Sequence, residues 1–270
     1  MASRKEQKEQ ARAARLAAER ALAERAQRNR RMLTLGGVLA AVVVVVAVLI
    51  VVSSSGSNNP GGIVTGAKQK QYEAQVNTLL AGIPQSGTTL GKPSAAVSVT
   101  YYGDLECPVC KDFTLGQAGG GFPQLVAQDV RQGRVKVTYR SFCTATCNSH
   151  SQSVFNDQQV AAYAAGSQNL FWDYAELFYR EQGDETTDYV DEKYLDTLAA
   201  QVNGLDIAKW QTDRGDPALL AQVQADEASA TADHVSATPS LIVKGPKGSV
   251  PLPAGAASYS ELEQAIKLAT

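Results

Sequence analysis

Residues 96–110 read AVSVTYYGDLECPVC, and this stretch decides the fold class. Most of its first seven residues are β-branched or aromatic, which is typical of a β-strand. Gly103 and Asp104 open a short turn. The chain can continue as a helix from Pro108, because proline is well tolerated in a first helical turn. The sequence therefore predicts a strand, a turn and a helix that begins at a Cys-x-x-Cys motif.

The spacing of Cys107 and Cys110 suits thiol–disulfide exchange. At a helix start, unpaired backbone N–H groups and the positive end of the helix dipole favour a thiolate on Cys107. Cys110 follows one turn later and can attack a mixed disulfide formed by the first sulfur. Structural disulfides and zinc sites use the same spacing, so the motif alone leaves both alternatives open.

A second motif lies far downstream. Residues 237–240 read ATPS and stand directly before the apolar run 241–243. A proline immediately before a strand suits a loop that brings backbone polar groups beside a catalytic sulfur, often through a cis peptide bond. The two motifs together are more specific than either one alone.

With these motifs, residues 90–270 resemble the DsbA-like branch of the thioredoxin-fold oxidoreductases. The resemblance rests on Gly-Asp-x-x-Cys-Pro-x-Cys at 103–110, on Phe-Trp-x-x-x-x-x-Phe at 171–178, and on Thr-Pro-Ser at 238–240. It implies the α/β fold class, with a thioredoxin-like fold that carries an inserted helical domain.

The resemblance also implies roles for four residues. Cys107 is expected to be the exposed nucleophile, Cys110 the buried resolving thiol, and the loop at Thr238 and Pro239 the place where a substrate backbone docks. Reduced or unfolded secreted proteins would be the substrates, and a membrane redox partner would reoxidise the enzyme. The resemblance implies neither a cofactor nor a metal.

Two positions depart from the family pattern. Val109 stands where the DsbA motif has a histidine, and Tyr101 stands where related enzymes often carry an acid that relays the buried thiol's proton. Asp104 and Glu106 add negative charge near Cys107, which opposes thiolate formation. We therefore expect a nucleophile less acidic than that of the strongest oxidants, and a milder oxidant.

Residues 67–270 are expected to form one DsbA-like domain. A lead-in helix over 67–83 and a Pro/Gly-rich connector over 84–93 precede the first strand. The helix at the motif is expected to break near residues 116–121. A second helix over 123–132 and an alternating strand over 134–142 then complete a β-α-β unit. If the two strands are parallel, residues 143–147 lie close to Cys107.

A helical insertion is predicted over about 151–231, and the sheet is then completed. Glycines and a Gly-Asp-Pro sequence divide the insertion into candidate helices 151–166, 170–181, 191–203 and 216–231. Trp172 and its aromatic neighbours on the second of these helices are expected in the core. Two strands at 241–243 and 249–252 and a helix over 258–268 follow.

The N-terminal part predicts a membrane anchor. Residues 1–32 form a basic tail, since 1–31 hold ten Lys/Arg and four Asp/Glu. Residues 33–52 contain no charge, and a helix of that length spans about 30 Å, the thickness of a bilayer core. The basic flank predicts a cytoplasmic N-terminus and an extracytoplasmic remainder, joined by a linker over 53–66. Cleavage after the apolar segment is the alternative.

The charge distribution excludes one class of partner. The residues after position 31 hold fifteen Lys/Arg and twenty-three Asp/Glu, a net charge of −8. Nucleic-acid binding requires a basic surface, so no nucleic-acid partner is expected.

Cys143 and Cys147 form a second pair with two open interpretations. A disulfide that staples a loop is favoured, because disulfides in secreted proteins are mostly structural. A second redox pair that relays electrons to Cys107 and Cys110 is the alternative, and a zinc site of four cysteines is a third. His150 and His234 are the histidines of the chain and are left out of the catalytic set.

The sequence thus predicts a membrane-anchored, extracytoplasmic oxidoreductase that promotes disulfide formation in secreted or membrane proteins. A reductase or isomerase of the same fold is the alternative among enzymes. A non-catalytic thioredoxin-fold binding module that uses the same groove is the alternative outside them.

Overall fold

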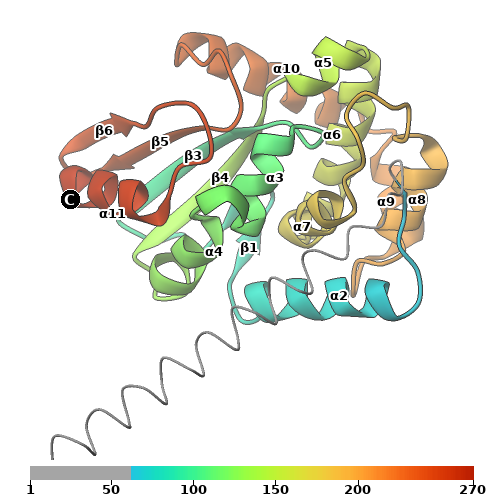
Figure 1. Cartoon of the computed structure of the whole chain (residues 1–270), viewed down its shortest axis with the longest axis horizontal. Coiled ribbons are helices and arrows are strands. Elements are labelled where there is room, and N and C mark those ends of the chain that lie inside the picture. Colours follow the sequence, from blue (N-terminus) through green and yellow to red (C-terminus); the bar gives the residue numbers. More distant parts are fainter. Residues whose placement is uncertain (1–61) are drawn as a thin grey trace, which may run out of the picture. The chain divides into compact units, whose positions relative to one another are not determined.

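A six-stranded sheet forms the frame of the structure (Figure 1). The computed structural model describes residues 62–270, which lie within one compact unit. Across the sheet the strands follow the order β1-β2-β4-β3-β5-β6. The bounds of β1 to β6 are Gln85–Ser86, Thr89–Leu90, Val97–Gly103, Val135–Ser141, Ser240–Gly245 and Gly248–Pro251.

Several predictions fall outside the described residues. They are the basic tail over 1–32, the transmembrane helix over 33–52 and the linker as far as residue 61. A search of residues 62–270 finds no helix with the length and apolar character needed to cross a bilayer. The predicted anchor therefore stays a prediction.

The central strands β3 and β4 run parallel, which the predicted β-α-β unit requires. Their register pairs Val97 with Val135 and Gly103 with Ser141, so both strands end at the same edge of the sheet. The Cys-x-x-Cys motif follows one strand end and the second cysteine pair follows the other. Both pairs therefore emerge at one rim of the sheet.

The prediction of a plain connector over 84–93 is wrong. β1 and β2 form a hairpin in this segment, and β2 pairs antiparallel with β4. The hydroxyls of Thr89 and Thr138 lie 2.9 Å apart across that pair. Two-residue strands are too short to show an alternating pattern, and this is why the sequence does not predict them. Gly87 forms the turn with φ of 54°, a conformation that glycine adopts without steric cost.

The motif helix, α3, spans Pro108–Leu115 and ends at Gly116, whose φ of 71° is left-handed. The predicted break after this helix is thereby confirmed. The chain resumes as α4, Phe122–Leu125, and continues as a π-helical turn over Val126–Val130. The predicted helix over 123–132 is therefore present as continuous helical chain over 122–130, with π-helical hydrogen bonding in its second half.

The helical insertion lies between β4 and β5, as predicted (Figure 1). Its four predicted helices are present, and two short ones, α5 and α9, were not predicted. Asp206 caps α9 by accepting the N–H of Lys209 at 3.0 Å, and this Asp at a helix start is the signal that was missed. The helices are α5 Ala145–Ser149, α6 Gln152–Gly166, α7 Phe171–Glu181, α8 Glu192–Ala199, α9 Ile207–Asp213 and α10 Pro217–Ala232.

Two further helices flank the sheet in sequence. The lead-in helix α2 covers Ala67–Leu80, three residues shorter at its C-terminus than predicted. The closing helix α11 covers Tyr259–Ala269 and packs on β5. A capping box between Ser258 and Glu261 fixes its start, because each residue's side chain bonds to the other's backbone N–H.

Trp172 of α7 lies in the core, as predicted, and joins the insertion to the sheet. It is fully buried and stacks on Phe122 of α4 with ring centroids 4.9 Å apart. Its indole N–H donates to the carbonyl oxygen of Thr88 at 3.0 Å. One side chain therefore contacts the insertion, the helix after the motif and the β1–β2 hairpin.

Replacing Trp172 by alanine should destabilise the fold strongly. Loss of a fully buried aromatic ring lowers the free energy of unfolding by about 3–5 kcal/mol, and the indole hydrogen bond is lost as well. Urea denaturation of the two proteins measures this change. Leu268→Ala is the control, because Leu268 is 60% exposed and should change stability by no more than about 0.5 kcal/mol. Equal effects of the two substitutions would contradict the role given to Trp172.

Candidate active site

The turn after β3 is narrow at Gly103. A β-carbon at this residue would lie 2.5 Å from the ring of Tyr139 and 3.1 Å from the ring of Tyr101, so a larger residue does not fit. The carbonyl of Asp104 then accepts the N–H of Cys107 at 3.1 Å and closes the turn. The turn delivers Cys107 to the start of α3.

Cys107 occupies the N-cap position of α3, and Pro108 follows in the first turn. The Cys107 carbonyl accepts the N–H of Lys111 at 3.1 Å, which begins the helical hydrogen bonding. Cys107 and Cys110 are free thiols, the first 6% exposed and the second fully buried. Only Cys107 is thus open to another molecule.

The loop before β5 lies against Cys107. The peptide bond between Thr238 and Pro239 is cis, and both residues are buried. The carbonyl oxygen of Thr238 lies 3.4 Å from the sulfur of Cys107 and accepts its S–H. The antiparallel register of β3 and β5, which pairs Tyr102 with Ser240, brings these distant segments together.

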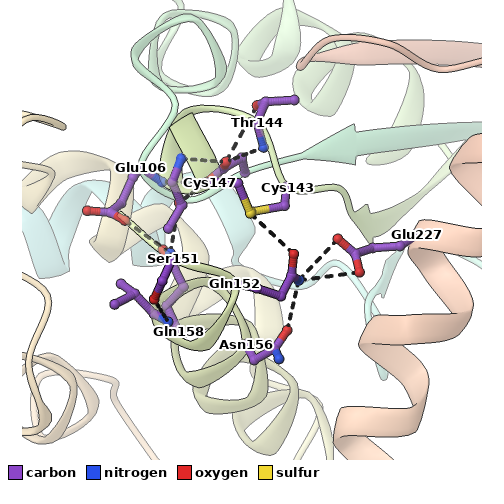
Figure 2. Close-up of a disulfide and its surroundings, with 12 residues drawn as sticks. Glu106, Cys143, Thr144, Cys147, Ser151, Gln152, Asn156, Gln158 and Glu227 are labelled. Atoms are coloured by element: carbon purple, nitrogen blue, oxygen red, sulfur yellow. Dashed lines mark hydrogen bonds between the residues drawn. A yellow bond between two sulfur atoms is a disulfide. The ribbon is translucent and has the colours of Figure 1, made fainter. Parts of the chain in front are cut away.

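The second cysteine pair is closed by a disulfide between Cys143 and Cys147, whose Cα atoms are 5.7 Å apart (Figure 2). With both sulfurs bonded to each other, a zinc site of four cysteines does not fit this arrangement. Gln152 of α6 lies beside the disulfide, with its amide oxygen 3.3 Å from the sulfur of Cys147. This approach is a contact and not a hydrogen bond, because a disulfide sulfur carries no proton.

A groove of about 460 Å³ is lined by one cysteine of each pair, Cys107 and Cys143. The helix start contributes residues 107–109, and the loop after β4 with α5 contributes residues 142–145, Asn148 and Ser149. Glu185 and residues 236–238 complete the lining. The structure therefore brings Cys107, Thr238 and the Cys143–Cys147 loop around one cavity, while the fully buried Cys110 lies behind it.

Residues 85–267 match the family model described as thioredoxin. The chain belongs to the thioredoxin family. Among curated relatives it resembles the "Disulfide bond formation protein D" of Bacillus subtilis, with 23% identity over 63% of this chain and 73% of that protein. A probable protein D of Bacillus anthracis matches with the same identity over 58% of this chain and 69% of that protein.

Solved structures of the same family support the fold. The oxidised BdbD of Bacillus subtilis superposes with a TM-score of 0.56 and 22% identity, over 68% of this chain and 94% of that one. DsbA2 of Pseudomonas aeruginosa gives a TM-score of 0.51 and 21% identity, over 69% and 95%. The family, the relatives and the Cys-x-x-Cys motif together make the chain a thiol–disulfide oxidoreductase.

The electrostatics of this thioredoxin-family site separate the two sulfurs. A hydrogen bond from the Cys110 side chain lowers the pKa of Cys107 to about 7, even though partial burial opposes the charge. Smaller lowering contributions to this pKa of about 7 come from the Thr238 side chain and the backbone N–H of Cys110. Full burial raises the pKa of Cys110 well above its usual value. Near neutral pH, Cys107 is thus partly thiolate and Cys110 is a thiol.

The expectation of a moderately acidic nucleophile agrees with the pKa of Cys107. The predicted cause, negative charge on Asp104 and Glu106, is wrong in part. Asp104 makes the smallest of the contributions to the pKa of Cys107, and its carboxylate accepts four well-formed hydrogen bonds from residues 106, 144 and 146. Glu106 points away, toward Gln158 and His150. Burial raises the pKa of Glu106 to about 7, so much of its charge is absent at neutral pH.

Tyr101 stands where the family often has an acid, and it supplies a hydroxyl group instead of a carboxylate. Its hydroxyl lies 3.2 Å from those of Thr114 and Tyr179 and 3.5 Å from the carbonyl oxygen of Cys110. Complete burial raises the pKa of Tyr101 well above its usual value, so the phenol stays neutral. The hydroxyl that Tyr101 places beside Cys110 is therefore polar but uncharged.

Sequence reasoning missed two features around the site. Gln182, at the end of α7, donates to the carbonyl oxygens of Leu105 at 2.7 Å and Cys107 at 3.1 Å, and so holds the active-site turn from the insertion. His150 has a buried side chain, 3.7 Å from Glu106 and 3.0 Å from the exposed Asp188. Neither contact has a signal in the sequence, because each joins segments separated by more than thirty residues.

The pH dependence of alkylation tests the assigned pKa of Cys107. Only the thiolate reacts, so the rate with iodoacetamide should rise with pH around a midpoint near 7. In Cys110→Ala the midpoint should move upward, because the largest favourable hydrogen bond to the thiolate is lost. Mass spectrometry assigns the alkylated residue. An unchanged midpoint in the variant would show that Cys110 does not stabilise the thiolate.

Proposed function

We propose that this chain is a membrane-anchored, extracytoplasmic oxidoreductase that promotes disulfide formation through the pair Cys107 and Cys110. The observation that carries the proposal is the asymmetry of the pair beside the Thr238–Pro239 loop. The Cys107 thiol has a lowered pKa and borders a groove, while the Cys110 thiol is fully buried and has a raised pKa. This is the arrangement that an attacking and a resolving thiol require.

The proposed exchange starts from a Cys107–Cys110 disulfide. A client thiolate attacks the sulfur of Cys107, the bond to Cys110 breaks, and Cys110 leaves as a thiolate that takes up a proton because its pKa is high. A second client thiolate then attacks the client sulfur of this mixed disulfide and releases Cys107 as a thiolate. The client loses two electrons and two protons and gains a disulfide, and the pair becomes a dithiol.

The groove favours extended polypeptide as the substrate. Within residues 62–270, Glu185 is the single charged residue of its lining, and Val109 presents an apolar side chain that is 40% exposed beside Cys107. In this proposal the loop at Thr238 and Pro239 docks the client backbone. A groove with so few charges would discriminate little between clients by the charge of their side chains. Clients would instead be recognised by an accessible cysteine in an unfolded segment.

The cellular setting of the proposal rests on the sequence before residue 62. The uncharged stretch 33–52 and its basic flank support a single-pass anchor with the catalytic domain outside the cytoplasm. Disulfides persist in that compartment, and the Cys143–Cys147 disulfide fits it. Repeated turnover then requires a membrane redox partner that accepts two electrons from the dithiol.

A reductase or isomerase is the second candidate, and the pKa of Cys107 is the observation that favours it. A pKa of about 7 is close to that of thioredoxin and far above that of DsbA, about 3.5. A weaker thiolate stabilises the reduced form less, which makes the disulfide a milder oxidant. The redox state of the pair in growing cells separates the candidates: an oxidase is recovered oxidised and an isomerase reduced.

Trapping of mixed disulfides tests the division of roles. Cys110→Ala should accumulate mixed disulfides between Cys107 and client proteins, because Cys110 can no longer attack the Cys107 sulfur and return the client thiol. Cys107→Ala should accumulate none, since buried Cys110 has no access to the groove. Non-reducing gel electrophoresis after acid quenching detects the complexes. Equal trapping by both variants would mean that Cys107 is not a dedicated nucleophile.

Fusion of a topology reporter after Thr270 tests the proposed location. A reporter enzyme that folds only outside the cytoplasm should be active in this fusion. A reporter that is active only in the cytoplasm should show no activity. Removal of residues 1–52 is the matched control and should reverse the result. Activity of the cytoplasmic reporter on the full chain would overturn the orientation and, with it, the oxidative role.

A further inference from the structure

Thr144 has an unusual place at the start of α5. A threonine at the N-cap normally accepts a backbone N–H of its own helix. The Thr144 side chain makes no such bond. Asp104 caps α5 from another segment instead, since its carboxylate accepts the N–H groups of Thr144 at 2.9 Å and of Thr146 at 3.0 Å. The Thr144 hydroxyl is therefore free to bond elsewhere.

That hydroxyl contacts the hydroxyl of Thr238, 2.5 Å away. The alternative acceptor, an oxygen of Asp104, lies 3.5 Å away and is at the limit of a hydrogen bond. Either hydroxyl can be the donor in this contact, and the arrangement in which Thr144 donates leaves Thr238 as the acceptor. Because a hydroxyl has one proton, Thr238 then keeps its own proton for another partner.

Thr238 also lies against the sulfur of Cys107. The Thr238 carbonyl oxygen lies 3.4 Å from that sulfur, and the Thr238 side chain lowers the pKa of Cys107. The other titratable groups that face Cys107 are Cys110 on α3 and Asp104 in the preceding turn, and Glu185 lines the groove. Contacts thus link the Thr144 hydroxyl, through Thr238, to the reactive sulfur.

The position of Thr144 is fixed from both sides. Its N–H is held by Asp104, and Cys143 beside it is tied to Cys147 across the first turn of α5. The loop is short, so the disulfide restrains the residues between its cysteines directly. Breaking it would release the segment that carries the donor hydroxyl.

We propose that Thr144 is a positioning residue that orients the hydroxyl of Thr238 toward the sulfur of Cys107, and that the Cys143–Cys147 disulfide holds Thr144 in place for this task. The second disulfide then influences the reactive pair without exchanging electrons with it. This inference rests on the proposed function only in taking Cys107 as the attacking sulfur.

Alkylation of Cys107 in the full-length chain tests the inference without any client protein. The protein is reduced only until mass spectrometry finds Cys107 and Cys110, but not Cys143 and Cys147, open to iodoacetamide. Thr144→Val keeps the shape and the backbone N–H but removes the hydroxyl. The pKa of Cys107 should rise by about 0.5 to 1, because an oriented hydrogen bond to the thiolate is weakened. Alkylation at pH 7 should slow about two- to fivefold.

Two variants serve as controls. Thr144→Ser keeps the hydroxyl and should restore the wild-type pKa of Cys107. Thr212→Val makes the same replacement at an exposed position of α9 and should leave that pKa unchanged. An unchanged pKa in Thr144→Val would overturn the role of Thr144, even if the melting temperature falls, because lost packing alone would produce that fall. Failure of the serine to restore the pKa would overturn the hydrogen-bond explanation.

The double variant Cys143→Ser/Cys147→Ser tests the part assigned to the disulfide. Released from its restraint, Thr144 should orient Thr238 less well, so the pKa of Cys107 should rise in the same direction as in Thr144→Val. A melting temperature that falls while this pKa stays constant would show that the disulfide is only a staple. Client trapping by Cys110→Ala, measured separately, decides the proposed function. A failure of the role given to Thr144 can therefore be distinguished from a failure of the proposed function.

Discussion

The contact between the sulfur of Cys107 and the carbonyl of Thr238 is the constraint on which the rest of the site depends. The two residues are 131 positions apart and meet only because β3 and β5 are neighbours in the sheet. The whole helical insertion lies between β4 and β5 in the sequence, yet it leaves this pairing intact. The sheet thus acts as a rigid frame that carries reactive groups on the loops at its edge.

Hydrogen bonding, more than net charge, sets the reactivity of Cys107. Burial disfavours a thiolate and Asp104 disfavours it slightly, but bonds from Cys110 and Thr238 outweigh both and lower the pKa to about 7. The buried carboxylates do not act as free charges: Asp104 is enclosed by donors, and burial raises the pKa of Glu106. The acidic residues that look inhibitory in the sequence are therefore largely structural.

The parts of the fold that follow a local pattern were predictable. The β-branched strand before the motif, the alternating strand β4 and the glycine break after α3 each have a clear signal within a few residues. The β1–β2 hairpin was not predictable, because two-residue strands show no period and gain stability only by pairing with β4.

The site was predictable only where a motif marks it. Residues 107–110 and 238–239 stand out in the sequence, but the contacts that tune them do not. Asp104 caps a helix forty residues away, and Thr144 bonds to a hydroxyl ninety-four residues away. Such pairings depend on the three-dimensional arrangement of loops at the sheet edge, which no local period encodes.

The central claim is that Cys107 and Cys110 transfer a disulfide to client proteins while Cys143 and Cys147 do not. Incubation of the oxidised full-length chain with a reduced, unfolded client, followed by mapping of free thiols in both proteins, tests it directly. The account predicts one disulfide gained by the client for each molecule of enzyme, new thiols at Cys107 and Cys110, and an intact Cys143–Cys147 disulfide. A client that stays reduced, or new thiols at Cys143 and Cys147, would contradict it.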